Sequence, residues 1–88
     1  MKPTKKLLFE RYGSRCMLCG KEYPKKYLQW HHLTPRYVYK NKNKPPDDSI
    51  ENSALVCANC HIMIHEFRYE EEQYQIYTSI ILQNKASF

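Results

Sequence analysis

The chain has 88 residues and a formal net charge of +5. This length fits a single domain with a small core, and no apolar run is long enough to span a membrane. Only Leu7, Leu8 and Phe9 are consecutive apolar residues near the start, too few for a secretory signal, so we expect an intracellular, cytoplasmic protein with reduced thiols and no membrane partner.

The first predicted elements are a short helix and an aromatic-rich strand. Residues 4–13 predict a helix, with Thr4 as its candidate N-cap and Gly13 just beyond its end. Residues 15–26 are a turn-rich knuckle. Residues 27–33 contain several aromatic side chains and predict a strand.

The second half of the chain predicts a loop, a strand and two helices. Residues 34–54 have no clean period and contain three prolines, which indicates a long loop. Residues 54–57 predict a brief strand, and residues 58–68 a helix with Asn59 as its candidate cap. Residues 70–85 predict a last helix, although the isoleucines there give the segment some strand tendency.

Four cysteines form two C-x2-C pairs, Cys16 with Cys19 and Cys57 with Cys60. Each pair places two thiolates on one tight turn, and two such pairs suit a shared tetrahedral Zn²⁺. Disulfides and redox dithiol chemistry are the alternatives, and no thioredoxin-like strand–helix context supports the second. Because four cysteines complete the coordination, this zinc would be structural, and folding should depend on it.

Four histidines form two further pairs. His31 and His32 are neighbours on the predicted strand, where adjacent side chains point to opposite faces. His61 and His65 are spaced i, i+4, which places both on one face of a helix and can present two imidazoles to one metal ion. If His31 faces that helix, these three can hold an ion, while His32 stays free to act as a base.

The histidines allow two other interpretations. A single histidine is more often a surface or core residue than a metal ligand. Because all four histidines lie in two pairs, this interpretation is weaker here. A C2H2 zinc finger would use Cys16, Cys19 and His32, but it then needs a histidine at positions 36 to 38, where the chain has Arg, Tyr and Val. The zinc-finger interpretation fails on this spacing.

The motif series C-x2-C-G, W-H-H and E-N-S-A-L-V-C-A-N-C-H-I-M-I-H resembles the HNH endonucleases, over roughly residues 7–66. The resemblance implies an α+β fold, a small ββα-metal (His-Me finger) domain with a four-cysteine zinc site and flanking helices. It implies one domain over residues 1–88, with an N-terminal helix at 1–13, a zinc-clamped core at 14–68 and a C-terminal helix or tail at 69–88.

The resemblance also implies a role for each site residue. His31 occupies the position of the first metal ligand, and His32 that of the general base which activates water. Asn52 matches the central Asn, whose side chain holds the hairpin loop and so orients the base. His61 matches the second ligand. His65 matches a third histidine of the all-histidine, colicin-type DNases, and either binds the metal or contacts the scissile phosphate.

The implied activity is metal-dependent hydrolysis of DNA, by nicking or double-strand cleavage, leaving a 5′-phosphate and a 3′-hydroxyl. The catalytic ion would be Mg²⁺ or Mn²⁺, with Ni²⁺, Co²⁺ and Zn²⁺ as further candidates because imidazole ligands favour them. A non-catalytic zinc-binding nucleic-acid module and an RNA nuclease are the alternatives.

The distribution of charge supports a nucleic-acid partner. Residues 1–44 carry twelve Lys or Arg and two acids, whereas residues 45–88 carry two Lys or Arg and seven acids. The basic half also contains aromatic residues, which suits a phosphate backbone, although a solvated surface would show the same pattern. The candidate nucleic-acid contacts are Arg36, Lys40, Lys42 and Lys44, and for Arg36 a solvated loop cation is an equal alternative.

The last segment bears on partners. Its apolar positions are Tyr74, Tyr77, Ile80 and Ile81. They either form a homodimer contact or pack on the domain's own core, and we favour the second interpretation. Compact HNH proteins, bacterial or phage-encoded, occur in phage packaging, restriction and mobile-element systems, so a phage or restriction partner protein is a further possibility.

Overall fold

The structure is a computed structural model that describes residues 3–34, 38, 41–43, 45 and 47–87. Its elements are α1 (Pro3–Tyr12), the 3-10 helix η1 (Lys25–Tyr27), β1 (Leu28–His32), the 3-10 helix η2 (Ile50–Asn52), β2 (Ser53–Cys57), α3 (Ala58–Glu66) and α4 (Glu71–Ala86). The expected α+β class is confirmed, and the segment with strand tendency near the C-terminus is a helix. No helix within the described residues has both the length and the apolar character needed to cross a bilayer.

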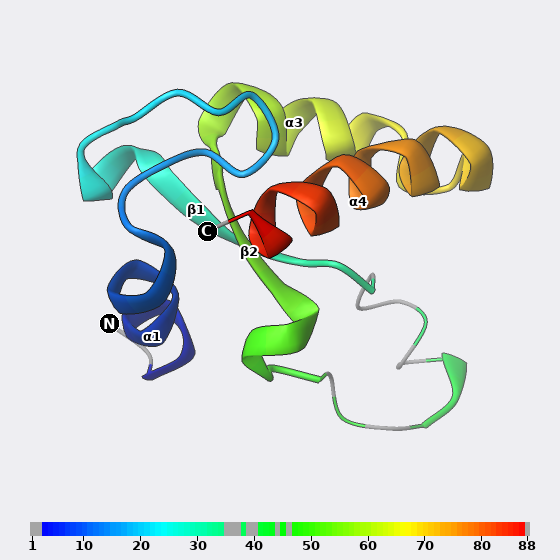
Figure 1. The fold of residues 1–88 in the computed structure, drawn as a ribbon. Coiled ribbons are helices and arrows are strands. Elements are labelled where there is room, and N and C mark those ends of the chain that lie inside the picture. The colour runs from blue at the N-terminus through cyan, green and yellow to red at the C-terminus, as the bar shows by residue number, and fades with distance from the viewer. Residues whose placement is uncertain (1–2, 35–37, 39–40, 44, 46, 88) are drawn as a thin grey trace.

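The two strands form one antiparallel pair between helices (Figure 1). Leu28 lies opposite Cys57, and His32 lies opposite Ser53. Helix α1 packs against β2, whereas α3 packs against both strands, and α4 folds back alongside α3. All five residues of β2 are buried, which explains why this strand has no alternation of apolar and polar residues.

The core lies between the strands and these helices. Its largest fully buried apolar side chains come from every layer, namely Leu8, Met17, Leu28, Leu55, Ile64 and Ile81. In α4, Tyr74 and Ile81 are buried, so core packing accounts for these two positions, whereas Ile80 is 37% exposed. Helix α4 is therefore part of the packed domain rather than a tail.

The two predicted helix caps are wrong. Thr4 lies inside α1, where its hydroxyl donates a hydrogen bond to the backbone carbonyl of Asp48 (2.7 Å). Asn59 lies inside α3, because that helix begins directly after β2 with Cys57 in the cap position. Gly13 does end α1 as predicted, since its φ of +76° is a left-handed conformation that favours glycine.

Polar contacts fix α4 to the rest of the domain. The Lys85 ammonium donates to the carbonyls of Ile50 (2.8 Å) and Ser53 (2.7 Å), and the Asn84 amide donates to the carbonyl of Met17. Burial lowers the pKa of Lys85. These bonds connect α4 to the start of β2 and to the first cysteine turn, so the helix braces both parts of the site described next.

Candidate active site

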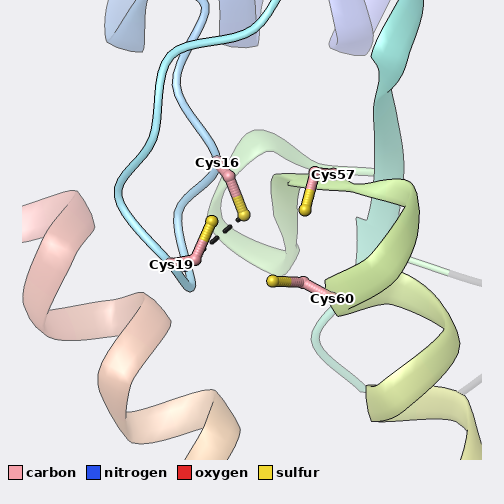
Figure 2. A group of neighbouring side chains, drawn as sticks. All are labelled: Cys16, Cys19, Cys57 and Cys60. Carbon is pink, nitrogen blue, oxygen red and sulfur yellow. Dashed lines mark hydrogen bonds between the residues drawn. The ribbon is translucent and has the colours of Figure 1, made fainter.

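The four cysteines converge at one end of the strand pair (Figure 2). Their sulfur atoms all lie within 4.8 Å of one another. Tetrahedral zinc, with Zn–S bonds of about 2.3 Å, places its sulfur ligands about 3.8 Å apart. The cluster therefore fits a tetrahedral thiolate site, and two turns that are distant in sequence meet there.

Local backbone geometry shapes the first turn of this cluster. The Cys19 amide donates to the Cys16 sulfur (3.5 Å), and the Gly20 amide donates to the Cys16 carbonyl (2.9 Å). Gly20 has a φ of +81°, a left-handed backbone conformation that glycine adopts more easily than residues with a side chain. The second turn needs no glycine, because β2 ends at Cys57 and the first turn of α3 carries Cys60.

Burial and neighbouring groups tune the thiols. Burial raises the pKa of the Cys16 and Cys60 thiols, so in the absence of a metal these groups stay protonated at neutral pH. A side-chain hydrogen bond with Cys57 raises the pKa of Tyr23 to about 12, which keeps that hydroxyl protonated beside the cluster. Metal binding at the cluster would therefore release protons.

A second cluster brings together three histidines from two elements. His31 comes from β1, and His61 and His65 come from one face of α3. One ring nitrogen from each lies within 4.8 Å of the others, and the Nε2 atoms of His61 and His65 are 3.0 Å apart. Three neutral imidazoles with ring nitrogens this close together can share a cation, so the donor set fits a divalent metal ion.

The electrostatics keep these three rings neutral. Burial, together with His61 and His65, lowers the pKa of His31 from 6.5 to about 3, and its side chain is only 4% exposed. Burial also lowers the pKa of His61 and His65. The positive charge of Arg68 contributes to the lowering at His65, so this arginine lies near the cluster. Only a neutral imidazole has a lone pair for a metal.

Two residues outside the predicted set contact these histidines. Gln29 Oε1 accepts a hydrogen bond from His61 Nδ1, which leaves the lone pair of the neutral ring on His61 Nε2, the atom that faces His65. The Tyr74 hydroxyl donates to the Leu33 carbonyl (2.9 Å) and lies 3.4 Å from His31 Nε2. Gln29 could have been found from sequence because it lies on the same strand face as His31, two residues away. Tyr74 had no such signal.

His32 points to the other side of β1. Its ring stacks on Trp30 with centroids 4.7 Å apart, and its Nε2 lies 2.7 Å from the Asp48 carboxylate. The opposite orientation of the two adjacent histidines follows from strand geometry, as the sequence indicated. Asp48 was not predicted, because it lies 16 residues away in the loop segment.

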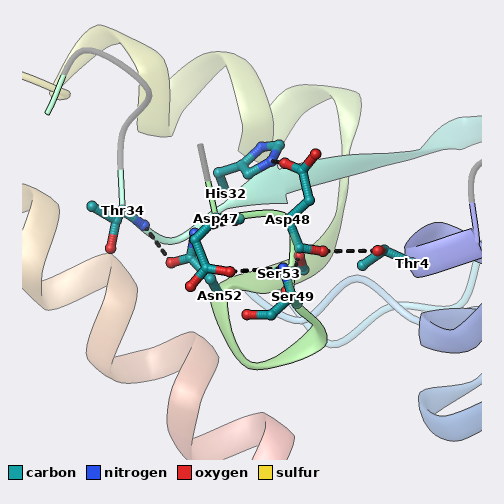
Figure 3. A network of polar contacts seen from close by, with 8 residues as sticks. All are labelled: Thr4, His32, Thr34, Asp47, Asp48, Ser49, Asn52 and Ser53. Atoms are coloured by element: carbon teal, nitrogen blue, oxygen red, sulfur yellow. Dashed lines mark hydrogen bonds and ion pairs between the residues drawn. The ribbon is translucent and has the colours of Figure 1, made fainter. Parts of the chain in front are cut away.

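Asn52 holds the end of that loop against the strand (Figure 3). Its side-chain oxygen accepts a hydrogen bond from the Thr34 amide (3.0 Å), and its amide group donates to the Asp47 carbonyl (2.8 Å). The Asp47 carboxylate in turn accepts from the Ser49 amide (2.9 Å). One buried side chain therefore joins the exit of β1 to the segment that carries Asp48.

The predicted nucleic-acid contacts fall in the segment that the structure describes only in part. Arg36, Lys40 and Lys44 lie outside the described residues. Lys42 is described and is exposed. Arg68, which follows α3, is a cationic residue near the histidine cluster, and it is not one of the predicted contacts.

Comparison with protein families matches this region to the HNH endonucleases, over residues 16–67. The chain belongs to the HNH endonuclease family. The match runs from the first cysteine to the turn after α3 and contains both clusters, whereas all of α1 and all of α4 lie outside it. Among curated proteins, none matches the chain.

Membership in the HNH family gives the two clusters a context. HNH domains use divalent metal ions, and a four-cysteine cluster beside the motif is consistent with a zinc-binding subtype of the family. Three histidines of the matched region, His31, His61 and His65, form the second cluster. Tyr74, which contacts one of them, comes from the helix that lies outside the matched region.

The low pKa of His31 gives a pH dependence of stability. Between about 3 and 6.5 the unfolded chain binds a proton that the folded chain does not, so stability is complete above pH 6.5 and falls as the pH drops toward 3. The slope is at most about 1.4 kcal/mol per pH unit. When the pH is lowered from 7.5 to 5.5, we expect the free energy of unfolding, measured with urea, to fall by about 1 kcal/mol more in the wild type than in His31→Gln. Equal losses in the two proteins would show that His31 is not neutral when buried.

Replacing Gln29 should weaken metal binding at the histidine cluster. Gln29→Ala removes the acceptor that orients His61, and loss of such a supporting contact typically costs about 10–100-fold in metal affinity. Calorimetric titration with Ni²⁺ measures this effect. The control is Gln75→Ala, an exposed position on α4, which should bind Ni²⁺ as the wild type does. Equal affinities in both variants would show that Gln29 does not support His61.

Proposed function

We propose that this protein is a metal-dependent DNA endonuclease that hydrolyses phosphodiester bonds and leaves a 5′-phosphate and a 3′-hydroxyl. One observation carries the proposal. His31 joins the other two histidines in a cluster that fits a divalent ion, while His32 turns to the opposite face and meets a carboxylate. Family membership supports a nuclease, and the excess of positive charge in the first half of the chain supports a nucleic-acid substrate.

His32 is proposed as the general base. A neutral imidazole carries one N–H, and the Asp48 carboxylate favours placing that hydrogen on Nε2, where it is donated. The lone pair is then on Nδ1, which can take a proton from water. The water oxygen bonds to phosphorus, and the bond from phosphorus to the 3′ oxygen breaks. That oxygen takes a proton from solvent to become the hydroxyl, and His32 returns its own proton to solvent.

The histidine cluster is proposed to hold the catalytic ion, through His31, His61 and His65. When bound there, a divalent ion supplies charge stabilisation to the phosphate and to the departing oxygen. Asn52 keeps the exit of β1 and the Asp48 segment in place, so it positions His32 rather than touching the substrate. The cysteine cluster is proposed to hold a structural Zn²⁺ with no open coordination position.

Supercoiled plasmid provides the direct test. Purified, zinc-loaded protein should convert it to nicked or linear DNA when Mn²⁺ or Mg²⁺ is added, and not in the absence of added metal. His61→Ala should lose this activity and keep its zinc, because it alters only the histidine cluster. The absence of cleavage by folded wild type with any of these metals, or cleavage of RNA alone, would contradict the proposal.

The choice of metal tests the histidine ligands separately. Three imidazoles bind Mn²⁺, Ni²⁺ and Co²⁺ more readily than Mg²⁺, which prefers oxygen ligands. We expect activity with Mg²⁺ or Mn²⁺, further activity with Ni²⁺ or Co²⁺, and inhibition by excess Zn²⁺. If cleavage did not respond to Mn²⁺ or Ni²⁺ concentration, the histidines would not be the ligands. A monomer should mainly nick, so prompt linear product would indicate paired copies.

A further inference from the structure

A pocket lies beside the histidine cluster, along α3 and the turn that follows it. It is a shallow hollow that is open to solvent, has a volume of about 610 Å³ and is lined by His61, Ile62, His65, Glu66, Arg68 and Tyr69. Because His61 and His65 form one wall, whatever fills the pocket lies directly next to the proposed catalytic ion.

The other wall carries a paired cation and aromatic ring. The Arg68 guanidinium lies 4.9 Å from the centre of the Tyr69 ring, and Tyr69 is 69% exposed. Ile62 adds a second exposed apolar surface, at 61%. A planar aromatic ring and an apolar side chain suit the face of a nucleobase, and a guanidinium suits a phosphate. The Glu66 carboxylate would repel phosphate, but it can accept a hydrogen bond from an amino group on a base edge.

We propose that this pocket is a nucleotide subsite of the nuclease, which takes one unpaired nucleotide next to the scissile bond. Its base stacks on Tyr69 beside Ile62, and Arg68 contacts its phosphate. A base paired in a regular duplex is stacked between its neighbours and cannot also stack on a tyrosine. The subsite therefore favours single-stranded or locally unpaired DNA over a regular duplex. This inference deepens the proposed function and rests on it for the position of the scissile bond.

The chain contains a matched control for this pair. Lys26 lies 5.2 Å from the centre of the Tyr27 ring, and Tyr27 is 53% exposed. That pair is in η1, on a different element from the pocket and before β1. It offers the same chemistry, a cation over an exposed tyrosine, without a neighbouring histidine cluster. General attraction of DNA to exposed cations and tyrosines would affect both pairs alike.

Fluorescence anisotropy of a labelled oligonucleotide tests the subsite apart from catalysis. Zinc-loaded protein without added Mg²⁺ or Mn²⁺ is titrated into a single-stranded oligonucleotide and into its fully paired duplex. We expect Tyr69→Ala to weaken single-strand binding by about 5- to 150-fold, the loss typical of one stacked base, and to affect the duplex much less. Tyr69→Phe should restore binding, and Arg68→Ala should weaken it. Tyr27→Ala and Lys26→Ala should leave the single-strand preference unchanged.

Three results would overturn the subsite: no loss in Tyr69→Ala, equal loss for both DNA forms, or equal loss in the Tyr27→Ala control. The plasmid assay separates this failure from that of the proposed function. If the wild type cleaves plasmid and Tyr69→Ala binds DNA normally, the subsite proposal is wrong and the nuclease proposal stands. If Tyr69→Ala selectively loses single-strand binding but the wild type never cleaves, the nucleotide site stands and the nuclease proposal is wrong.

Discussion

Replacing His32 with alanine should abolish most of the cleavage activity while leaving both clusters intact. The side chain is the proposed base, and general-base catalysis typically contributes about 10²–10⁴-fold to a rate. His32 is not among the three histidines that converge, so metal affinity should not change. Plasmid cleavage rates at saturating Mn²⁺ measure the loss, which should appear in kcat rather than in KM.

Two variants make this result specific. Asp48→Asn keeps a side chain of the same size beside His32 but removes the carboxylate, so it should lower the rate by less than His32→Ala does. Gln75→Ala changes an exposed residue on α4 and should leave kcat unchanged. If His32→Ala cleaved at the rate of the wild type, another group would have to activate the water, and the proposed role of His32 would be wrong.

Replacing Cys57 with serine should prevent cooperative folding. Cys57 is buried at the junction of β2 and α3, and its sulfur belongs to the four-thiol cluster. Structural zinc sites contribute about 10–16 kcal/mol of apparent binding free energy at neutral pH, comparable to or greater than the whole stability of a small domain. We expect the variant to lose stoichiometric zinc, its near-UV circular dichroism and its sigmoidal thermal transition.

Chelation and a second variant test the same claim. Removing zinc from the wild type with a strong chelator should unfold it in the same way, and added Zn²⁺ should restore the fold. His61→Ala removes a residue of the other cluster and should stay folded with one zinc per chain. A Cys57→Ser protein that unfolded cooperatively at the wild-type temperature would show that the cysteine cluster does not hold the domain together.

The elements that sequence predicted well are those with a local signal. The strand at Leu28–His32 and the helix at Ala58–Glu66 follow from aromatic content and from i, i+4 spacing. Opposite faces for His31 and His32 follow from the two-residue period of a strand. The helix caps failed, because Thr4 bonds to a loop distant in sequence and because α3 begins directly at the end of β2. Cap preferences are worth only about 1 kcal/mol, which such tertiary contacts can exceed.

The sequence by itself determined which residues are of types that can bind a metal ion and how they are grouped. The relevant motifs are two C-x2-C pairs, a His-His pair and a His-x3-His pair. Within each motif, the backbone geometry of a few residues sets where the side chains point, so the sequence alone is enough to predict it. Only the tertiary structure decided which groups meet them. Asp48 reaches His32 across 16 residues, and Tyr74 reaches His31 across 43. These contacts depend on how the loop, the strands and α4 pack together, and no local period or spacing encodes that packing.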